Sequence, residues 1–367
     1  MRSLLPLLSV LLASVASGQA PLSGMLSAPD GTPYADVEVR LESGRLDVPD
    51  STRTDAEGRF AFERAVAGAI VVSTGGEPLW LPLAIPDSAS GPFTLDLVVP
   101  PVRGEGADYL AGFRASGTRP LAEVIPIYVA AEAGHRTPVT SPELEAATEE
   151  MQAQVSEAPL DRKNAVRDSL RALVGPLYEA ALQPRVDAYD AALPTGALEG
   201  TAMAHAFWRL YRITPDSLTA LRVLETVPTD APLWSFQGLS RSGVNNTLFL
   251  LARALVPDGG PVPAPLDAYF RALAYGYPDP NVRAQASGVI VGVLRSAGND
   301  QRAAVAVDRL YREHPDSYQA ERLRRDEAED RRVQAGRQLP DFAIPSLADS
   351  TVMITRADLS GKTVLVD

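Results

Sequence analysis

The spacing of apolar residues changes once along this chain, and that change limits the possible fold more than any other feature. Between residues 21 and 100, apolar and polar residues alternate, as in the run from Val37 to Leu41, which predicts strands with one buried face. From residue 142 onward, apolar residues recur three and four positions apart, as they do between Leu170 and Leu177. That spacing predicts amphipathic helices. The 367 residues therefore divide into a β domain followed by a helical domain.

Turn signals divide residues 21–100 into short strands. Asp30-Gly31 and the run from Asp55 to Gly58 are typical hairpin turns, and Phe60 and Phe62 after the second turn point to one face. Three apolar runs supply further strands: Ala69 to Ser73, Trp80 to Leu83 and Phe93 to Val99. Short strands at this spacing predict a small antiparallel β-sandwich.

Three segments of this region carry a resemblance to a known family: "DGTPYADVEVRL", "TRTDAEGRFAF" and "AGAIVVST". In order and pattern they resemble the carboxypeptidase regulatory-like domain, a transthyretin-type sandwich. The resemblance implies a fold more than an activity, since such modules mostly act as spacers or adhesion units, and some are attributed carbohydrate binding.

Four carboxylates of the sandwich are conceivable Ca²⁺ ligands, namely Asp47, Asp50, Asp55 and Glu57. Hairpin turns are rich in Asp for a local reason, because the side chain accepts hydrogen bonds from nearby backbone amides. We therefore expect turn-forming carboxylates here and no metal site.

Residues 101–141 are predicted to form a Pro- and Gly-rich linker and a first helix, and residues 142–335 a helical domain. Prolines are expected to cut this domain into helices of about one to two dozen residues. They are Pro159, Pro176, Pro184, Pro194, Pro215, Pro228, Pro257, Pro278 and Pro315.

An internal echo lies in the helical domain. "LYRITPDSLTALR" from Leu210 and "LYREHPDSYQAER" from Leu310 share the order helix, Pro-Asp-Ser turn, helix, with the serine able to cap the second helix. The repeat loosely resembles tetratricopeptide-like helical hairpins, whose stacked pairs expose a surface for peptides or partner proteins. The simpler interpretation is that Tyr211 and Tyr311 only pack the hairpins.

The first 20 residues predict export. Arg2 is followed by an apolar stretch from Leu4 to Ala16 and by small residues around Gly18 and Ala20, which is typical of a secretory signal peptide. A retained N-terminal anchor is the alternative. We expect a periplasmic or extracellular protein with no membrane span after cleavage. An exported protein can form disulfides, yet this sequence contains no Cys, and therefore no thiol nucleophile or thiolate metal ligand.

Residues 336–367 contain a distinct motif. Pro340-Asp341-Phe342 is followed by an expected hairpin, by Asp358-Leu359 and a Gly361-Lys362 turn, and by an apolar strand ending at Asp367. This order resembles the start of a thioredoxin-fold domain of the TlpA/ResA type, related to the peroxiredoxins.

The resemblance implies that a Trp-Cys-x-x-Cys active site follows the closing strand, so the sequence is expected to be a fragment that ends within an α/β domain. In thioredoxins an Asp at the end of this strand lies near the cysteine pair and helps to move its proton, which makes Asp367 a candidate proton acceptor.

The sequence gives little support for nucleic-acid binding, a metal site or other catalytic motifs. The net charge of −12 argues against nucleic-acid binding. His135, His205 and His314 are far apart in the sequence, and no motif for a serine nucleophile or a phosphate loop is present. No cofactor is expected.

The sequence thus predicts an exported thiol–disulfide oxidoreductase whose catalytic cysteines are missing from this chain, acting on client proteins with disulfides or thiols. The alternative is a non-enzymatic exported binding or scaffold protein that uses the sandwich and the helical repeats.

Overall fold

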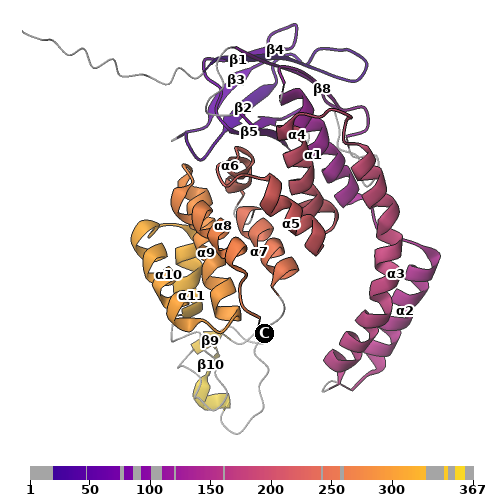
Figure 1. Ribbon diagram of the computed structural model, residues 1–367, viewed down its shortest axis with the longest axis vertical. Helices are drawn as coiled ribbons and strands as arrows, with labels where there is room; N and C mark the ends of the chain where they lie inside the picture. Colours follow the sequence, from indigo (N-terminus) through magenta and orange to yellow (C-terminus); the bar gives the residue numbers. More distant parts are fainter. Residues whose placement is uncertain are drawn as a thin grey trace, which may run out of the picture.

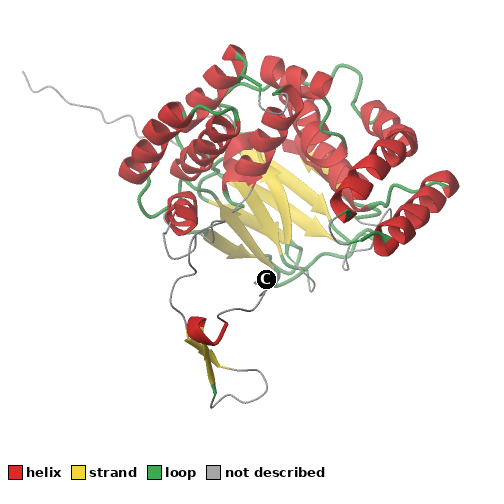
Figure 2. Ribbon diagram, turned by 90° about the horizontal axis from the view of Figure 1, so that it is seen from below, coloured by secondary structure: helices red, strands yellow, loops and turns green. Residues whose placement is uncertain are grey.

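The computed structural model describes most of the chain. The described residues are 20–46, 48–74, 78–85, 92–100, 110–119, 121–159, 162–240, 243–256, 260–327, 343–345 and 352–359. Residues 1–19, which belong to the predicted signal peptide, lie outside them, as do Asp47 and Asp367. Two N-terminal sheets pack beside a large helical region, whose helices form an arc along one side of the strands (Figures 1 and 2).

The strands form two four-stranded sheets, as the alternating pattern predicts. The first has the order β4-β1-β7-β8, made of Arg59–Phe62, Leu22–Ser27, Phe93–Val98 and Arg114–Gly117. The second has the order β3-β2-β5-β6, made of Asp50–Arg53, Glu38–Glu42, Gly68–Val72 and Leu79–Leu83. Neighbouring strands are antiparallel, with one exception among the described pairs: β1 runs parallel to β7.

The predicted turns and faces of the sandwich are confirmed. Gly31 and Gly58 have φ of +86° and +78°, a backbone region that glycine adopts without steric strain. In β4 the side chains of Phe60 and Phe62 are buried while Arg59 and Ala61 are exposed. Every residue of β5 is buried, as expected for a strand covered on both faces.

The sandwich extends further along the chain than the sequence suggested. Residues 114–117 fall in the stretch predicted to be a linker, but they form β8 and pair with β7, so that Leu97 lies opposite Ala115. Because β8 contacts α1, the last strand of the sandwich leads directly into the helices.

In its described residues, the helical region comprises α1 to α11 and the π-helix η2. Their bounds are Leu121–Arg136 (α1), Pro142–Glu157 (α2), Lys163–Ala191 (α3), Glu199–Trp208 (α4), Arg209–Ile213 (η2), Ser217–Thr226 (α5), Leu233–Gly238 (α6), Gly243–Leu255 (α7), Ala264–Gly276 (α8), Pro280–Ser296 (α9), Asp300–Glu313 (α10) and Tyr318–Glu327 (α11). Figure 1 shows α2 and α3 extending away from the other helices as an antiparallel arm.

The expectation that every proline ends a helix is wrong for α3. This helix runs for 29 residues through Pro176 and Pro184. Each proline removes one amide donor to the carbonyl four residues earlier. Those carbonyls belong to Ala172 and Ala180, both exposed residues, where water can take the place of the amide. The other prolines that the structure describes from the predicted set do lie between helices.

The two echo segments have the predicted order of helix, turn and helix, but their caps differ. Before α11, Ser317 Oγ accepts from the Ala320 amide at 3.2 Å, as expected. Before α5, the cap is Asp216 and not Ser217, because Asp216 Oδ1 accepts from the Thr219 amide at 2.8 Å.

The described part of the closing segment forms the expected hairpin. β9 (Ala343–Pro345) pairs antiparallel with β10 (Met353–Thr355), which places Ile344 opposite Ile354, and the short helix η4 (Arg356–Leu359) follows. None of the described helices combines the length and the apolar character needed to cross a membrane.

Candidate functional site

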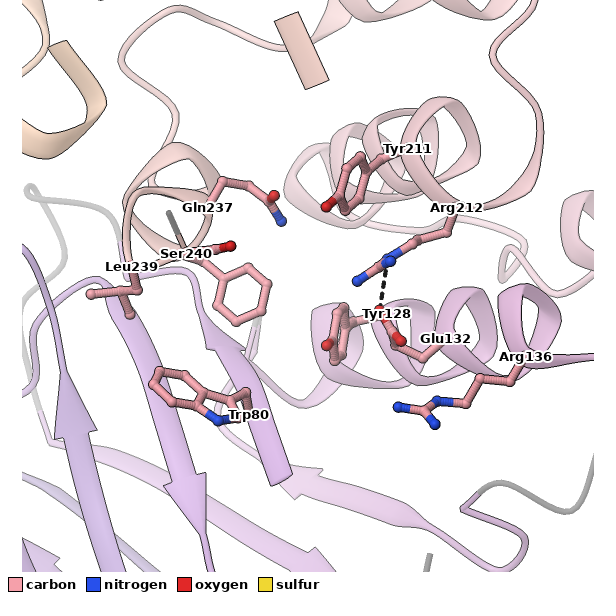
Figure 3. Close-up of a pocket in the computed structure, with 10 residues that line it drawn as sticks. Trp80, Tyr128, Glu132, Arg136, Tyr211, Arg212, Gln237, Leu239 and Ser240 are labelled. Atoms are coloured by element: carbon pink, nitrogen blue, oxygen red, sulfur yellow. Dashed lines mark ion pairs between the residues drawn. The ribbon is translucent and has the colours of Figure 1, made fainter. Parts of the chain in front are cut away.

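A pocket of about 370 Å³ lies where the sandwich meets the helices. Its wall comes from β6, α1, η2, α6 and the residues after α6 (Figure 3). The lining residues are Trp80, Tyr128, Glu132, Arg136, Tyr211, Arg212, Phe236, Gln237, Leu239 and Ser240. Its volume is within the range of small-molecule sites, which are typically apolar with a few convergent polar groups.

One wall of the pocket is the π-helix η2, which continues α4. The Thr214 amide donates to the Arg209 carbonyl at 2.8 Å, five residues back, so the turn holds one residue more than an α-helical turn. Such turns are rare and frequently occur at functional sites. Here η2 contributes both Tyr211 and Arg212 to the pocket.

Glu132 and Arg212 form an ion pair on the pocket wall. Arg212 Nε lies 2.8 Å from Glu132 Oε1, and the Glu132 side chain is only 6% exposed. The contact lacks the alignment of a hydrogen bond, so it acts as a close charge pair. Arg212 also lies over the Tyr211 ring, 4.5 Å from its centroid. Breaking a buried pair of this kind leaves an uncompensated charge, so each partner holds the other in place.

Aromatic side chains make up much of the rest of the wall. The Tyr128 ring meets the rings of Trp208 and Phe236 edge-on, at 5.2 Å and 5.3 Å between centroids. Trp80 comes from β6, on the sandwich side of the pocket (Figure 3). Trp208 is fully buried and also meets Phe236, so the rings of Tyr128 and Phe236 are supported by the core of the helical region.

Two further polar side chains face the pocket. They are the amide of Gln237, a residue only 4% exposed, and the hydroxyl of Tyr211. Figure 3 shows the two groups directed toward each other, above the Arg212 guanidinium. Neither group is among the buried atoms that lack a partner, so both are accessible from the pocket, and a ligand there can form hydrogen bonds with them in place of water.

The three histidines lie in separate parts of the helical region. His135 is in α1, His205 in α4, and His314 follows α10. His205 is buried and stacks on Tyr189 with 4.4 Å between ring centroids, and burial lowers its pKa, which favours a neutral packed side chain. Within the described ranges, no group of three His, Asp or Glu side chains is placed to hold a metal ion.

The carboxylates considered for Ca²⁺ have other neighbours where the structure describes them. Asp55 Oδ1 accepts from the amides of Glu57 and Arg59, at 3.0 Å and 2.8 Å, which is the turn role proposed from the sequence. Asp50 opens β3, opposite Leu41 of β2.

The tyrosines of the echo have different environments. The Tyr311 hydroxyl donates to Glu327 Oε2 at 3.0 Å and packs α10 against α11, as predicted, whereas Tyr211 lines the pocket. The pocket was not predicted from the sequence, although the echo that contains Tyr211 and Arg212 is a signal that points to this region.

Searches of family models, of curated proteins and of solved structures find no match to this chain.

Proposed function

We propose that this chain is the accessory part of an exported thiol–disulfide oxidoreductase of the thioredoxin superfamily. The observation that carries the proposal is the closing motif, from Pro340 to Asp367, in the order of that family. The local geometry of its described part is consistent with the motif. The β9–β10 hairpin lies where the motif requires one, and Asp358 Oδ2 accepts from the Thr355 amide and hydroxyl at 2.8 Å and 2.7 Å.

The chemistry implied by the proposal is attack by a thiolate on a client disulfide through a mixed disulfide. The 367 residues contain no Cys, so the sulfur atoms would come from residues outside this sequence. Asp367 would receive a proton beside them. The sandwich and the helices, for which we propose a tetratricopeptide-like arrangement, would position the redox domain or recruit its clients.

The coding sequence beyond the Asp367 codon tests this proposal. A Cys-x-x-Cys pair shortly after the closing strand supports it, and the protein that carries the pair should reduce insulin disulfides in the presence of a thiol donor. Replacing the first Cys by Ser should abolish that turnover. A reading frame without the pair contradicts the proposal.

A second candidate function is non-enzymatic binding, and the pocket favours it. The accessible Gln237 amide and the aromatic wall are features of a ligand site, whether or not a redox domain is attached. Because Trp80 lines the pocket, its fluorescence should respond to an occupant. The variant Gln237→Met keeps the size of the side chain and removes its polar atoms. If the pocket is a binding site, this variant should weaken binding about tenfold, a typical effect of losing a buried hydrogen bond.

A further inference from the structure

The strongest unexplained feature of the pocket is a pair of opposite charges fixed side by side. Arg212 Nε faces Glu132 Oε1, so the other guanidinium nitrogens and the second carboxylate oxygen are left for a ligand. In Figure 3 the Arg212 guanidinium is directed into the pocket, between the rings of Tyr211 and Tyr128 and beside Glu132. The exposed Arg136 adds a second positive charge to the lining.

A ligand that carries one charge of each sign complements this arrangement. A carboxylate beside Arg212 and an ammonium beside Glu132 would complete a ring of four alternating charges without adding net charge to the pocket. The planar guanidinium suits a carboxylate in particular, because it can donate two parallel hydrogen bonds. The Gln237 amide would supply a further donor to the carboxylate.

The aromatic wall specifies the rest of the ligand. Trp80, Tyr128 and Phe236 offer apolar ring surface for a side chain, and ring faces also attract an ammonium group. A volume of about 370 Å³ accommodates a free amino acid with a large apolar side chain.

We propose that the pocket binds a zwitterionic α-amino acid with an apolar or aromatic side chain. Arg212 and Gln237 hold its carboxylate, Glu132 holds its ammonium group, and the rings from β6, α1 and α6 contact its side chain. This inference rests on the binding function proposed for the same pocket and is independent of the redox proposal.

A ligand series tests the inference on the unaltered protein. L-phenylalanine and L-leucine are titrated by calorimetry and by tryptophan fluorescence, beside N-acetyl-L-phenylalanine, which lacks the ammonium, and L-phenylalaninamide, which lacks the carboxylate. Each derivative should bind at least about tenfold more weakly than L-phenylalanine, because each loses a hydrogen bond to a charged group. Derivatives that bind as tightly as the amino acid overturn the inference.

Variants assign each charge to its partner. Glu132→Gln should make L-phenylalanine and its N-acetyl derivative bind alike, and Arg212→Gln should make L-phenylalanine and its amide bind alike. Arg309→Gln is the matched control, since Arg309 also lies over a tyrosine ring, that of Tyr275 at 3.4 Å, and pairs with Glu313 at 2.7 Å, but it is not among the pocket residues. The control should bind like the unaltered protein.

The remaining outcomes distinguish the proposed amino-acid ligand from the more general proposal that the pocket is a binding site. Glucose or methyl glucoside binding to the pocket in place of the amino acids overturns the amino-acid inference and leaves the binding function standing. Absence of binding by every probe overturns both. If Glu132→Gln or Arg212→Gln does not fold, the ligand series on the unaltered protein decides whether the pocket binds a zwitterionic amino acid.

Discussion

At the scale of single residues, the contact between the sandwich and the helices depends on a glycine and a buried aspartate. Asp279 is fully buried and caps α9 by accepting from the Asn281 amide at 2.8 Å. Gly44, in the loop after β2, lies so close that a Cβ there would be 2.1 Å from Asp279 Oδ2. A side chain at residue 44 would therefore require the buried Asp279 carboxylate or the loop around Gly44 to move.

We therefore expect Gly44→Ala to destabilise the protein. Placing a methyl group in a filled contact typically lowers the free energy of unfolding by about 1–3 kcal/mol. Gly292→Ala is the control, because Gly292 is exposed within α9 and a Cβ there meets no atom within 4 Å. That change should raise stability by about 0.5–1 kcal/mol, since alanine is the better helix former. Urea unfolding of both variants measures the difference, and equal effects would contradict the assigned contact.

Asp279 should also make stability depend on pH. Burial raises its pKa, while the nearby cations Arg45 and Arg283 oppose that shift. The folded state therefore holds the proton more tightly than the unfolded chain, whose aspartates have a pKa of about 3.9. The stability of the protein relative to Asp279→Asn should fall as pH rises from about 4 through the raised folded pKa, and stay constant above it.

Asp279→Ala separates the cap from the charge. Asn can still accept the hydrogen bonds of a helix cap, whereas Ala cannot, so Asp279→Ala should lose about 1 kcal/mol at every pH relative to Asp279→Asn. Thermal unfolding of the variants across the pH range measures both effects. A stability difference between the native protein and Asp279→Asn that does not change with pH would rule out the ionisation argument.

At the scale of elements, the arm formed by α2 and α3 should be the least stable part of the helical region. Leu144 is the one buried residue of α2, and the buried residues of α3 all lie in its second half, at Leu182, Val186 and Tyr189. By contrast, α9 has ten buried residues, from Val282 to Leu294. Local opening requires less free energy where little apolar surface is buried.

Native-state hydrogen exchange should reveal this difference. Amides of residues 147–157 and 165–175 should exchange by local opening, with protection well below that of α9, whose amides should approach the global free energy of unfolding. Added denaturant should leave the exchange of the arm almost unchanged and accelerate that of α9. Equal protection in the two elements would show that the arm is held by contacts not apparent in the structure.

The elements also show how far a single sequence specifies this fold. The strands were predictable because alternation is a local signal, and β5 was recognisable as an apolar run. The long helix α3 could not be predicted from the sequence. Whether a proline ends a helix depends on the surroundings of the carbonyl that the proline leaves without an amide donor. The pocket was not predictable either, because Trp80, Tyr128 and Arg212 come from three distant segments, which meet only because α1 contacts both β6 and η2.

At the scale of the whole molecule, one continuous apolar core joins the sandwich to the helices. It extends from Ala20 and Leu22 in the sandwich to Val307 in α10, with Leu110, Phe113 and Leu121 buried at the junction. Contacts of α1 with β6 and β8, and of α6 with β5 and β6, form the shared boundary. Domains joined by such an interface are expected to unfold together, because separating them exposes apolar surface on both sides.

A substitution in the core of the sandwich should therefore lower the stability of the helices as well. Leu95 in β7 is fully buried, and Leu95→Ala should lower the free energy of unfolding by about 2–5 kcal/mol. Far-ultraviolet circular dichroism reports mainly on the helices. Its transition temperature should fall by the same amount as that of a spectroscopic signal from the sandwich. Glu63→Gln, at an exposed position of the sandwich, should leave both signals unchanged. If Leu95→Ala lowers only the transition of the sandwich and the helical signal keeps its midpoint, the two regions are independent. A pocket built from both of them could then not hold its shape when the sandwich opens.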